Sequence, residues 1–380
     1  MLTNLSTYLI DKVEPYAKWT TIIILCLAIT TLAILFFKNK KAFKKVSITL
    51  GISFLVYSLI LGIVLLSLEI SKKYDIAYLK DNWVNLKVIN LVFIPLIITL
   101  GLMLISFIII FILKLKNNSK TKLISTICGV ICFLSAVVTI VLMAVYHKKY
   151  VVGDGYYTDS NHGKLNSPLL NVSALILVVI SIGGGFLFSK NDKRPFDAKA
   201  IAFAGICISI SFALSYIKFG LPQGGSITLV SLLPIMVFSY VYGTKKGVFV
   251  GLIYGVLQAV QDPWLLHPAQ FLLDYPIAFS MVGFAGIFKN RNFAKKSPQV
   301  GFVMGGLVCG ILRYTSHVLS GVFAFGAYAA DKGKNFLLYS LAYNSFVFVD
   351  LAIVLIVGAM VFSSKVFQKT IESRQQETLN

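Results

Sequence analysis

The stretch VINLVFIPLIITLGLMLISFIIIFIL (88–113) contains 26 consecutive residues without a charged side chain. A helix of about 20 predominantly apolar residues crosses the roughly 30 Å hydrocarbon core of a bilayer, so this stretch predicts a membrane-spanning helix. The whole chain has the same character, because 57% of its 380 residues are hydrophobic, only 13% are charged and the mean hydropathy is +0.82. Soluble domains carry about a quarter charged residues. We therefore expect an all-α protein that crosses the membrane many times.

Eleven apolar stretches of this kind are expected to form about eleven transmembrane helices. They are 20–37, 46–70, 88–113, 123–146, 169–188, 201–217, 227–241, 248–260, 271–288, 300–319 and 336–362. A charged segment with a proline separates the first five from the last six and favours a domain boundary. The expected organisation is a five-helix membrane module of unassigned role (1–190), a charged cytoplasmic linker (191–200), a six-helix substrate-binding domain (201–365) and a cytoplasmic tail (366–380).

The formal charge of +20 comes from Lys and Arg residues in short loops between the apolar stretches. Alternate loops, among them 38–45, 114–122 and 289–296, carry most of the 35 basic residues. By the positive-inside rule these loops are cytoplasmic, which places the C-terminus inside and the N-terminus outside the cell membrane. A nucleic-acid-binding protein would instead gather its cations on one soluble face. The sequence therefore favours contact with the lipid bilayer and argues against nucleic acid as a partner.

Ionisable side chains enter the apolar stretches almost only in the second half of the chain. Asp274, followed by Tyr275, lies early in one stretch, and Arg313 and His317 lie one helical turn apart in the next. An ionisable residue inside a bilayer is a functional hypothesis by default. We expect Asp274 to bind a cationic ligand and His317 to contact the ligand rings. A structural ion pair between Asp274 and Arg313 remains open.

Aromatic and amide side chains near the same end extend this candidate site. Phe325 beside Gly321 offers an aromatic face for a planar cation, or else belongs to an interfacial aromatic belt. Tyr339 and Asn344 lie in the last apolar stretch, where the amide bonds either a ligand or a neighbouring helix. Asp350, deeper in that stretch, pairs with another polar group or takes part in proton coupling.

The loop FGLPQGGS (219–226) is rich in glycine around a proline and is expected on the outer side. Its residues Gly224, Gly225 and Ser226 either form a lid over the cavity or belong to an ordinary turn. The sequence contains neither an HExxH zinc motif nor a GxSxG nucleophile elbow, and it lacks a Walker A motif. We therefore expect a transport protein without catalytic residues, metal site or cofactor, and not an enzyme.

Five motifs follow one another between residues 198 and 365. They are PQGGSITLVSLLPI (222–235), YGTKKGVFVGLIYGVLQ (242–258), QFLLDYPIAF (270–279), LRYTSHVLSGVFAF (312–325) and YSLAYNS (339–345). In order and approximate spacing they resemble the thiamine-specific S component of energy-coupling factor (ECF) vitamin transporters. The resemblance covers nearly half of the chain and does not extend to residues 1–190.

This resemblance implies a six-helix bundle that opens outward and captures thiamine. Such a subunit docks on an ECF transmembrane coupling subunit driven by two cytoplasmic ATPase subunits, so ATP hydrolysis would reside in the partners. The family docks through small residues on its first helix. Here Ala198 and Ala202, and Ala200 and Ala204, have small-xxx-small spacing, but Ile206 interrupts the register that aligns best.

The resemblance also implies a substrate-binding set. By motif this set comprises Asp274, Tyr275, His317, Gly321, Phe325, Tyr339 and Asn344. Asp274 stands where the family has Glu, and Phe325 where it often has a stacking Trp. Either other residues compensate for these two departures, or the ligand is a related pyrimidine or thiazole compound.

Two other functions remain open. A stand-alone secondary transporter would use Asp350 and Arg313 to couple the movement of a vitamin-like cation to an ion gradient. A membrane sensor or scaffold would use the first five helices to contact a partner.

Overall fold

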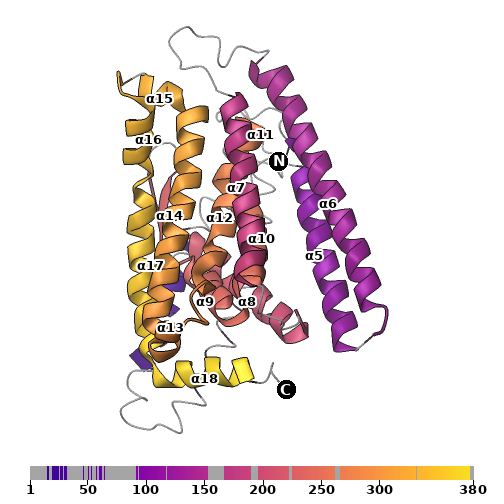
Figure 1. The fold of residues 1–380 in the computed structure, drawn as a ribbon, viewed down its shortest axis with the longest axis vertical. Coiled ribbons are helices and arrows are strands. Elements are labelled where there is room, and N and C mark those ends of the chain that lie inside the picture. The colour runs from indigo at the N-terminus through magenta and orange to yellow at the C-terminus, as the bar shows by residue number, and fades with distance from the viewer. Residues whose placement is uncertain are drawn as a thin grey trace.

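The computed structural model describes residues 91–152 except 93 and 117, 167–189, 196–221, 225–261, 266–330 and 332–376, with scattered positions between 15 and 64. Figure 1 shows long helices side by side. Six helices within the described residues are long and apolar enough to cross a membrane: Ile94–Leu115, Thr121–Lys149, Ser167–Phe188, Ala198–Ser215, Pro298–Ala324 and Phe336–Ser363. The chain is a multi-pass membrane protein, as its composition predicts. The predicted stretches 20–37 and 46–70 are described only at separate positions, so eleven spans stay a prediction.

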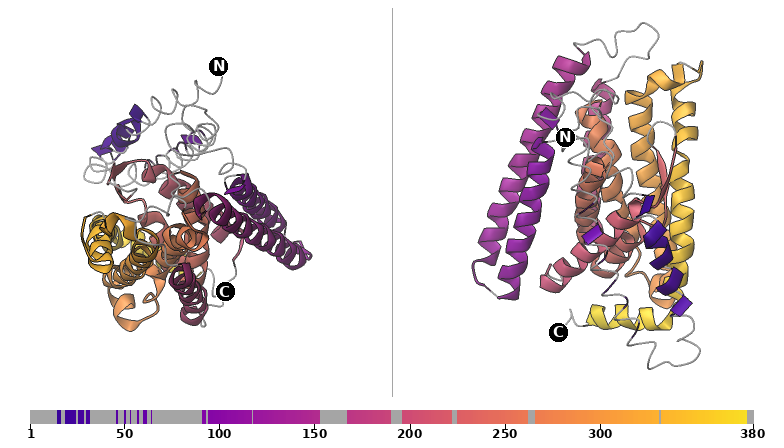
Figure 2. Two further views of the ribbon diagram at one scale, coloured as in Figure 1. Left: turned by 90° about the horizontal axis from the view of Figure 1, so that it is seen from above. Right: turned by 180° about the vertical axis from the view of Figure 1, so that it is seen from behind.

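Two antiparallel helices, α5 (Ile94–Leu115) and α6 (Thr121–Tyr146), stand at one edge of the molecule (Figure 2). The chain continues from α6 into a π-helical turn, η2 (His147–Val152). We call α5, α6 and η2 together the N-terminal hairpin. The Thr99 hydroxyl bonds those of Ser135 and Thr139 at 2.7 and 2.9 Å, which joins α5 to α6. Most of the remaining surface of the hairpin is bulky and apolar, as suits contact with lipid.

Helix α7 (Ser167–Phe188) comes before the predicted domain boundary but packs into the second half of the chain. Leu170, Ala174 and Leu177 belong to the main hydrophobic core. The Ser181 and Ser280 hydroxyls are 2.7 Å apart and join α7 to the bundle. The described part of the first half is therefore not a single separate body, because α7 lies in the bundle whereas the N-terminal hairpin lies beside it.

Residues 198–363 form the helical bundle that holds the main core. Its helices are α8 (Ala198–Ser215), α9 (Leu233–Tyr242), α10 (Thr244–Gln261), an interrupted segment (268–286), α14 (Pro298–Ala324), α16 (Phe336–Asn344) and α17 (Phe346–Ser363), with the short α15 (Gly326–Ala330) before α16. The Asp197 side chain caps α8 by accepting from the Ala200 N–H at 2.8 Å. Small residues allow close helix packing: a Cβ on Gly305 of α14 would lie 2.1 Å from the Ala285 carbonyl oxygen.

Two of the predicted spans are interrupted in the structure. The stretch 271–288 is divided into α11 (Pro268–Leu272), the π turn η4 (Leu273–Ile277), α12 (Ala278–Ser280) and the 3₁₀ helix η5 (Met281–Gly286). Pro276 within η4 has no N–H to donate, which favours a break in the α-helical pattern. The last span breaks at Ser345, between α16 and α17. Interrupted helices at membrane depth are typical of segments that border a substrate cavity.

The expectation of an all-α fold is wrong at one place, a small antiparallel pair of strands. β1 (Lys218–Gly220) pairs with β2 (Ser226–Thr228), so that Phe219 lies opposite Ile227. The helix predicted over 227–241 therefore begins only at Leu233. The reason is tertiary, because the N–H and hydroxyl of Thr228 both donate to Asp350 Oδ1 at 2.9 Å.

A last helix, α18 (Lys365–Gln376), occupies the predicted tail and runs across the lower end of the bundle (Figure 1). The Phe367 ring meets the Phe362 ring edge-on at 5.1 Å, and Ile371 is buried. The short helix α13 (Asn292–Lys296) and the α5–α6 connection lie at the same lower end. Three of the Lys- and Arg-rich segments therefore share one end of the molecule.

Candidate functional site

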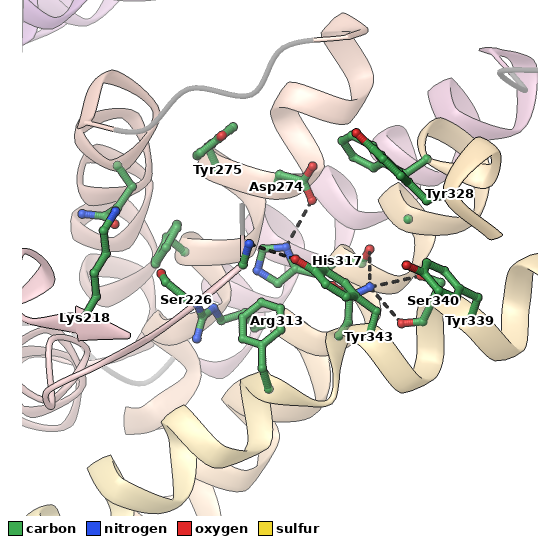
Figure 3. Close-up of a pocket in the computed structure, with 17 residues that line it drawn as sticks. Lys218, Ser226, Asp274, Tyr275, Arg313, His317, Tyr328, Tyr339, Ser340 and Tyr343 are labelled. Carbon is green, nitrogen blue, oxygen red and sulfur yellow. Dashed lines mark hydrogen bonds and ion pairs between the residues drawn. The ribbon is translucent and has the colours of Figure 1, made fainter. Parts of the chain in front are cut away.

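A cavity of about 150 Å³ lies in the bundle (Figure 3). Several of its lining residues belong to α15 and α16, which lie at the end of the molecule opposite α18 (Figure 1). The walls of the cavity come from the β1–β2 pair, α10, η4, α12, α14, α15, α16 and the start of α17. The lining residues are Lys218, Gly225, Ser226, Gln258, Asp274, Tyr275, Phe279, Arg313, His317, Gly321, Phe325, Tyr328, Tyr339, Ser340, Tyr343, Asn344 and Phe346. All seven residues of the predicted substrate-binding set are among them.

Asp274 is the only acidic residue among the described residues that line this cavity. Its Oδ2 accepts hydrogen bonds from Gln270 Nε2 and from the Ser320 hydroxyl, both at 2.7 Å, and its Oδ1 lies 3.1 Å from His317 Nδ1. The side chain is 18% exposed. Three protein donors therefore hold the carboxylate in place at the cavity wall, and charge-assisted bonds of this kind are stronger than neutral ones.

His317 lies one turn above Arg313 on α14 and faces Asp274 (Figure 3). An ionised carboxylate can only accept, so in this contact the His317 Nδ1–H donates a hydrogen bond to Asp274 Oδ1. The opposite ring nitrogen, Nε2, is buried and has no hydrogen-bond partner in the described protein. Neutral His317 therefore offers a free acceptor beside the carboxylate.

Aromatic rings supply much of the remaining wall. Phe325 ends α14 and lies 6.3 Å from the Tyr328 ring, with 27° between the two planes. Tyr339 and Tyr343, one turn apart on α16, are nearly parallel, with centroids 6.4 Å apart. Flat, electron-rich faces of this kind suit a planar cationic ligand.

Gly321 and Asn344 lie at a close contact between α14 and α16. A Cβ on Gly321 would lie 2.2 Å from the Ser340 hydroxyl, so glycine is required for this packing. Asn344 Nδ2 donates to the Ser340 carbonyl oxygen at 2.9 Å and lies 3.3 Å from the His317 carbonyl oxygen. The Asn344 amide nitrogen thus joins the two helices at the cavity wall.

Arg313 pairs with Asp350, not with Asp274. The two side chains are almost fully buried, and Arg313 Nη1 donates to Asp350 Oδ2 at 2.8 Å. Asp350 Oδ1 also receives both bonds from Thr228. This buried pair fixes β2 against α17 and leaves the charge of Asp274 available to the cavity.

The predicted lid is described only in part. Gly224 lies outside the described residues, whereas Gly225 and Ser226 line the cavity. The Gly225 N–H donates to the Tyr343 hydroxyl at 2.9 Å. The end of the loop is therefore bound to α16, the helix that carries Tyr339 and Asn344.

The sequence analysis leaves out five of the polar lining residues: Lys218, Gln258, Tyr328, Ser340 and Tyr343. Tyr343 directly precedes Asn344 in a motif already singled out, and its place one turn after Tyr339 was the available signal. Gln258 ends the motif 242–258 that was also singled out, and the packing of α10 brings it to the cavity. Lys218 carried no such signal, because only the β1–β2 pairing places it there.

Known proteins match the part of the chain that builds this cavity. Residues 201–371 match the family described as thiamine transporter protein (Thia_YuaJ). The thiamine transporter ThiT of Bacillus subtilis (strain 168) is 34% identical over 164 residues, covering 41% of this chain and 83% of the relative. That of Lacticaseibacillus paracasei is 30% identical over 167 residues, with the same coverage. A solved ThiT structure from Listeria monocytogenes is 23% identical and covers 44% of this chain and 94% of its own, with a TM-score of 0.40. Through residues 201–371, this chain belongs to the thiamine transporter protein family.

Proposed function

We propose that the cavity binds thiamine and that the chain is the substrate-capturing subunit of a membrane importer. The observation that carries the proposal is Asp274, an acidic side chain in an aromatic-lined cavity, held by three donors. Thiamine carries a permanent positive charge on its thiazolium ring and hydrogen-bonding groups on its aminopyrimidine ring. The relatives named as thiamine transporters support the same ligand.

In this proposal Asp274 offsets the charge of the thiazolium ring. A buried cation without a counter-charge is costly, and attraction between charges is stronger in a cavity than in water. His317 Nε2, which has no partner in the described protein, accepts a hydrogen bond from an N–H group of the ligand. Asp274 and His317 together thus recognise a positive charge and an N–H donor at neighbouring positions of the ligand.

The rings of Tyr275, Phe325 and Tyr339 stack on the two flat rings of the ligand. Gly321 leaves room for the ligand beside α14, and Asn344 bonds its polar edge. Gly224, Gly225 and Ser226 close over it, with the Gly225–Tyr343 hydrogen bond as the contact that holds the loop in place.

We further propose that the cavity opens outward and that partner subunits supply the energy for uptake. The basic segments around α13 and the α5–α6 connection lie at the end with α18, which by the positive-inside rule is cytoplasmic. The sequence lacks a Walker A motif. An ECF transmembrane coupling subunit and two cytoplasmic ATPases, as the resemblance implies, would complete the importer.

Ligand titration tests the proposed substrate. The full chain in detergent is titrated with thiamine while its Trp and Tyr fluorescence is recorded, with pyridoxine and riboflavin as controls. We expect saturable quenching by thiamine alone. A saturable response to a different vitamin, with none to thiamine, would overturn the proposed ligand.

Reconstitution tests the proposed partners. The chain, the coupling subunit and the ATPases are reconstituted together into vesicles. These vesicles should accumulate thiamine only when ATP is supplied on the side of the membrane where the ATPases lie. Uptake by the chain alone, driven by a proton or sodium gradient, would establish a secondary transporter instead. The buried Arg313–Asp350 pair does not favour that alternative, because both Asp350 oxygens are already bonded, one by Arg313 Nη1 and the other by Thr228.

A further inference from the structure

The N-terminal hairpin lies outside the family match and touches the bundle at two levels. Lower down, Phe107 of α5 packs against α8 beside Gly205, and Lys114 Nζ donates to the Phe196 carbonyl oxygen. The second contact lies near the upper end. There Leu96 and Leu100 of α5 and Met143 of α6 form one buried apolar cluster with α10 and with Phe271 of α11. Below this cluster the large apolar side chains of α5 and α6 are mostly exposed, and the hairpin leans away from α7 (Figure 1). The hairpin therefore meets the bundle next to the segment that carries Asp274.

The apolar cluster includes a wall of the cavity. Tyr275 lines the cavity and also packs against the buried cluster that holds Leu96 and Met143. Its ring lies 5.5 Å from the Phe271 ring. Since Tyr275 lies in the π turn η4, where helical hydrogen bonding is irregular, its position depends on such side-chain packing.

A chain of hydrogen bonds runs from the hairpin to the carboxylate of Asp274. His147, directly after α6, donates from Nδ1 to the Leu266 carbonyl oxygen at 2.7 Å. The Leu266 N–H donates to Gln270 Oε1 at 3.0 Å, and Gln270 Nε2 donates to Asp274 Oδ2 at 2.7 Å. Gln270 is fully buried, so its amide has little freedom to turn. The His147 ring also meets the His267 ring edge-on at 4.6 Å.

We infer that the N-terminal hairpin positions the cavity wall formed by Asp274 and Tyr275, with His147 as a positioning residue. The hydrogen bonds through Leu266 and Gln270 orient the carboxylate, and the apolar cluster supports the Tyr275 ring. This gives the added helices a role in setting ligand affinity. The inference rests on the proposed function only where its test measures thiamine affinity.

The first measurement compares thiamine affinity in variants of the full chain. His147→Ala removes the donor to Leu266 and should weaken binding about five- to tenfold, in the range of one lost hydrogen bond. His147→Asn keeps an N–H donor near the position of Nδ1 and should recover most of the affinity. Val138→Ala, at an exposed position of α6, is the matched control and should bind as the wild type does.

A double-mutant cycle separates positioning from general destabilisation. If His147 acts through the carboxylate, His147→Ala should change affinity less than about twofold when Asp274→Asn has already removed the charge. An equal loss in both backgrounds would overturn the inference, as would wild-type affinity in His147→Ala.

Hydrogen exchange without ligand keeps the two proposals distinct. His147→Ala should speed amide exchange in residues 268–277, whereas Val138→Ala should not. Unchanged exchange would overturn the positioning role whatever the ligand is. Wild-type protein that does not bind thiamine, together with faster exchange in His147→Ala, would overturn the proposed function alone.

Discussion

Helices α6 and α14 have nearly the same length, 26 and 27 residues, yet they meet very different surroundings. Of α6, only Cys128, Thr139 and Met143 are buried. In α14 eleven residues are buried, and glycine or a polar side chain makes up most of them. Helix α6 packs against α5 on one side and is otherwise largely exposed, whereas α14 packs against η5, α16 and α17 and borders the cavity.

This difference shows what a membrane helix needs for each role. A lipid-facing helix requires only apolar side chains of any shape, and lipid is as apolar as leucine. A helix inside a bundle needs small residues for close approach and polar groups with partners. The N-terminal hairpin and the bundle can therefore be told apart by composition, and substitutions should affect them unequally.

The largest effect is expected in the bundle, at the cavity. Asp274→Ala should weaken thiamine binding by about 3 kcal/mol or more, roughly a hundredfold in Kd, because the ligand cation would lose its buried counter-charge. Isothermal titration of the full chain measures this loss. Asp274→Glu keeps the charge and should lose much less affinity. Wild-type affinity in Asp274→Ala would remove the carboxylate from the site.

A pair of glycine substitutions tests the comparison between α14 and α6 directly. Gly305→Ala places a Cβ 2.1 Å from the Ala285 carbonyl oxygen and should cost about 1–3 kcal/mol of stability. Gly129→Ala in α6 meets nothing within 4 Å and should be neutral or stabilise by about 0.5 kcal/mol. Thermal unfolding in detergent measures both. Equal shifts in melting temperature would show that α6 is as closely packed as α14.

A smaller effect is expected where the loop is bound to α16. Tyr343→Phe removes the acceptor of the Gly225 N–H and keeps the ring, so it should cost about 1 kcal/mol. The loss should raise the dissociation rate of thiamine about fivefold in stopped-flow fluorescence, with little change in the association rate. A slower association with unchanged dissociation would mean that the bond shapes the entrance and does not retain the ligand.

The sequence predicts the lipid-facing parts of the fold well, and it predicts the interruptions poorly. The stretch 123–146 lies within α6, because uniform apolarity over a membrane length allows only a helix. The helix predicted over 227–241 was wrong at its start, because Thr228 lies in a strand and bonds to Asp350, 122 residues away. A pattern of apolar residues contains no information about such a distant partner.

The candidate site shows the same division. The order of the motifs was enough to predict that Asp274, His317 and Asn344 line one cavity. It did not predict that Gln270 and Ser320 share the Asp274 carboxylate, or that His147 from the first half reaches the same segment. Those contacts depend on how helices dock, which is decided by side chains on both partners.

An effect that depends on pH is expected at the boundary between the two regions, where His267 begins α11. Burial, together with the neighbouring His147, lowers the pKa of His267 to about 4, from 6.5. Between these values the unfolded chain binds a proton that folded His267 does not, so stability falls as the pH drops through this window and is unaffected above it. The melting temperature should therefore decrease by several degrees between pH 7 and pH 4.5.

The matched variant is His267→Asn, because His267 Nδ1 accepts from the Ala269 N–H at 3.1 Å and asparagine caps a helix start in the same way. Without the titrating ring, the decrease between pH 7 and pH 4.5 should be smaller, while the melting temperature at pH 7 should change little. Carboxylates and His147 titrate in both proteins, so the difference between the two curves isolates His267. An identical pH dependence would mean that the ring becomes protonated in the folded protein, and that the contact between the N-terminal hairpin and α11 is open to water.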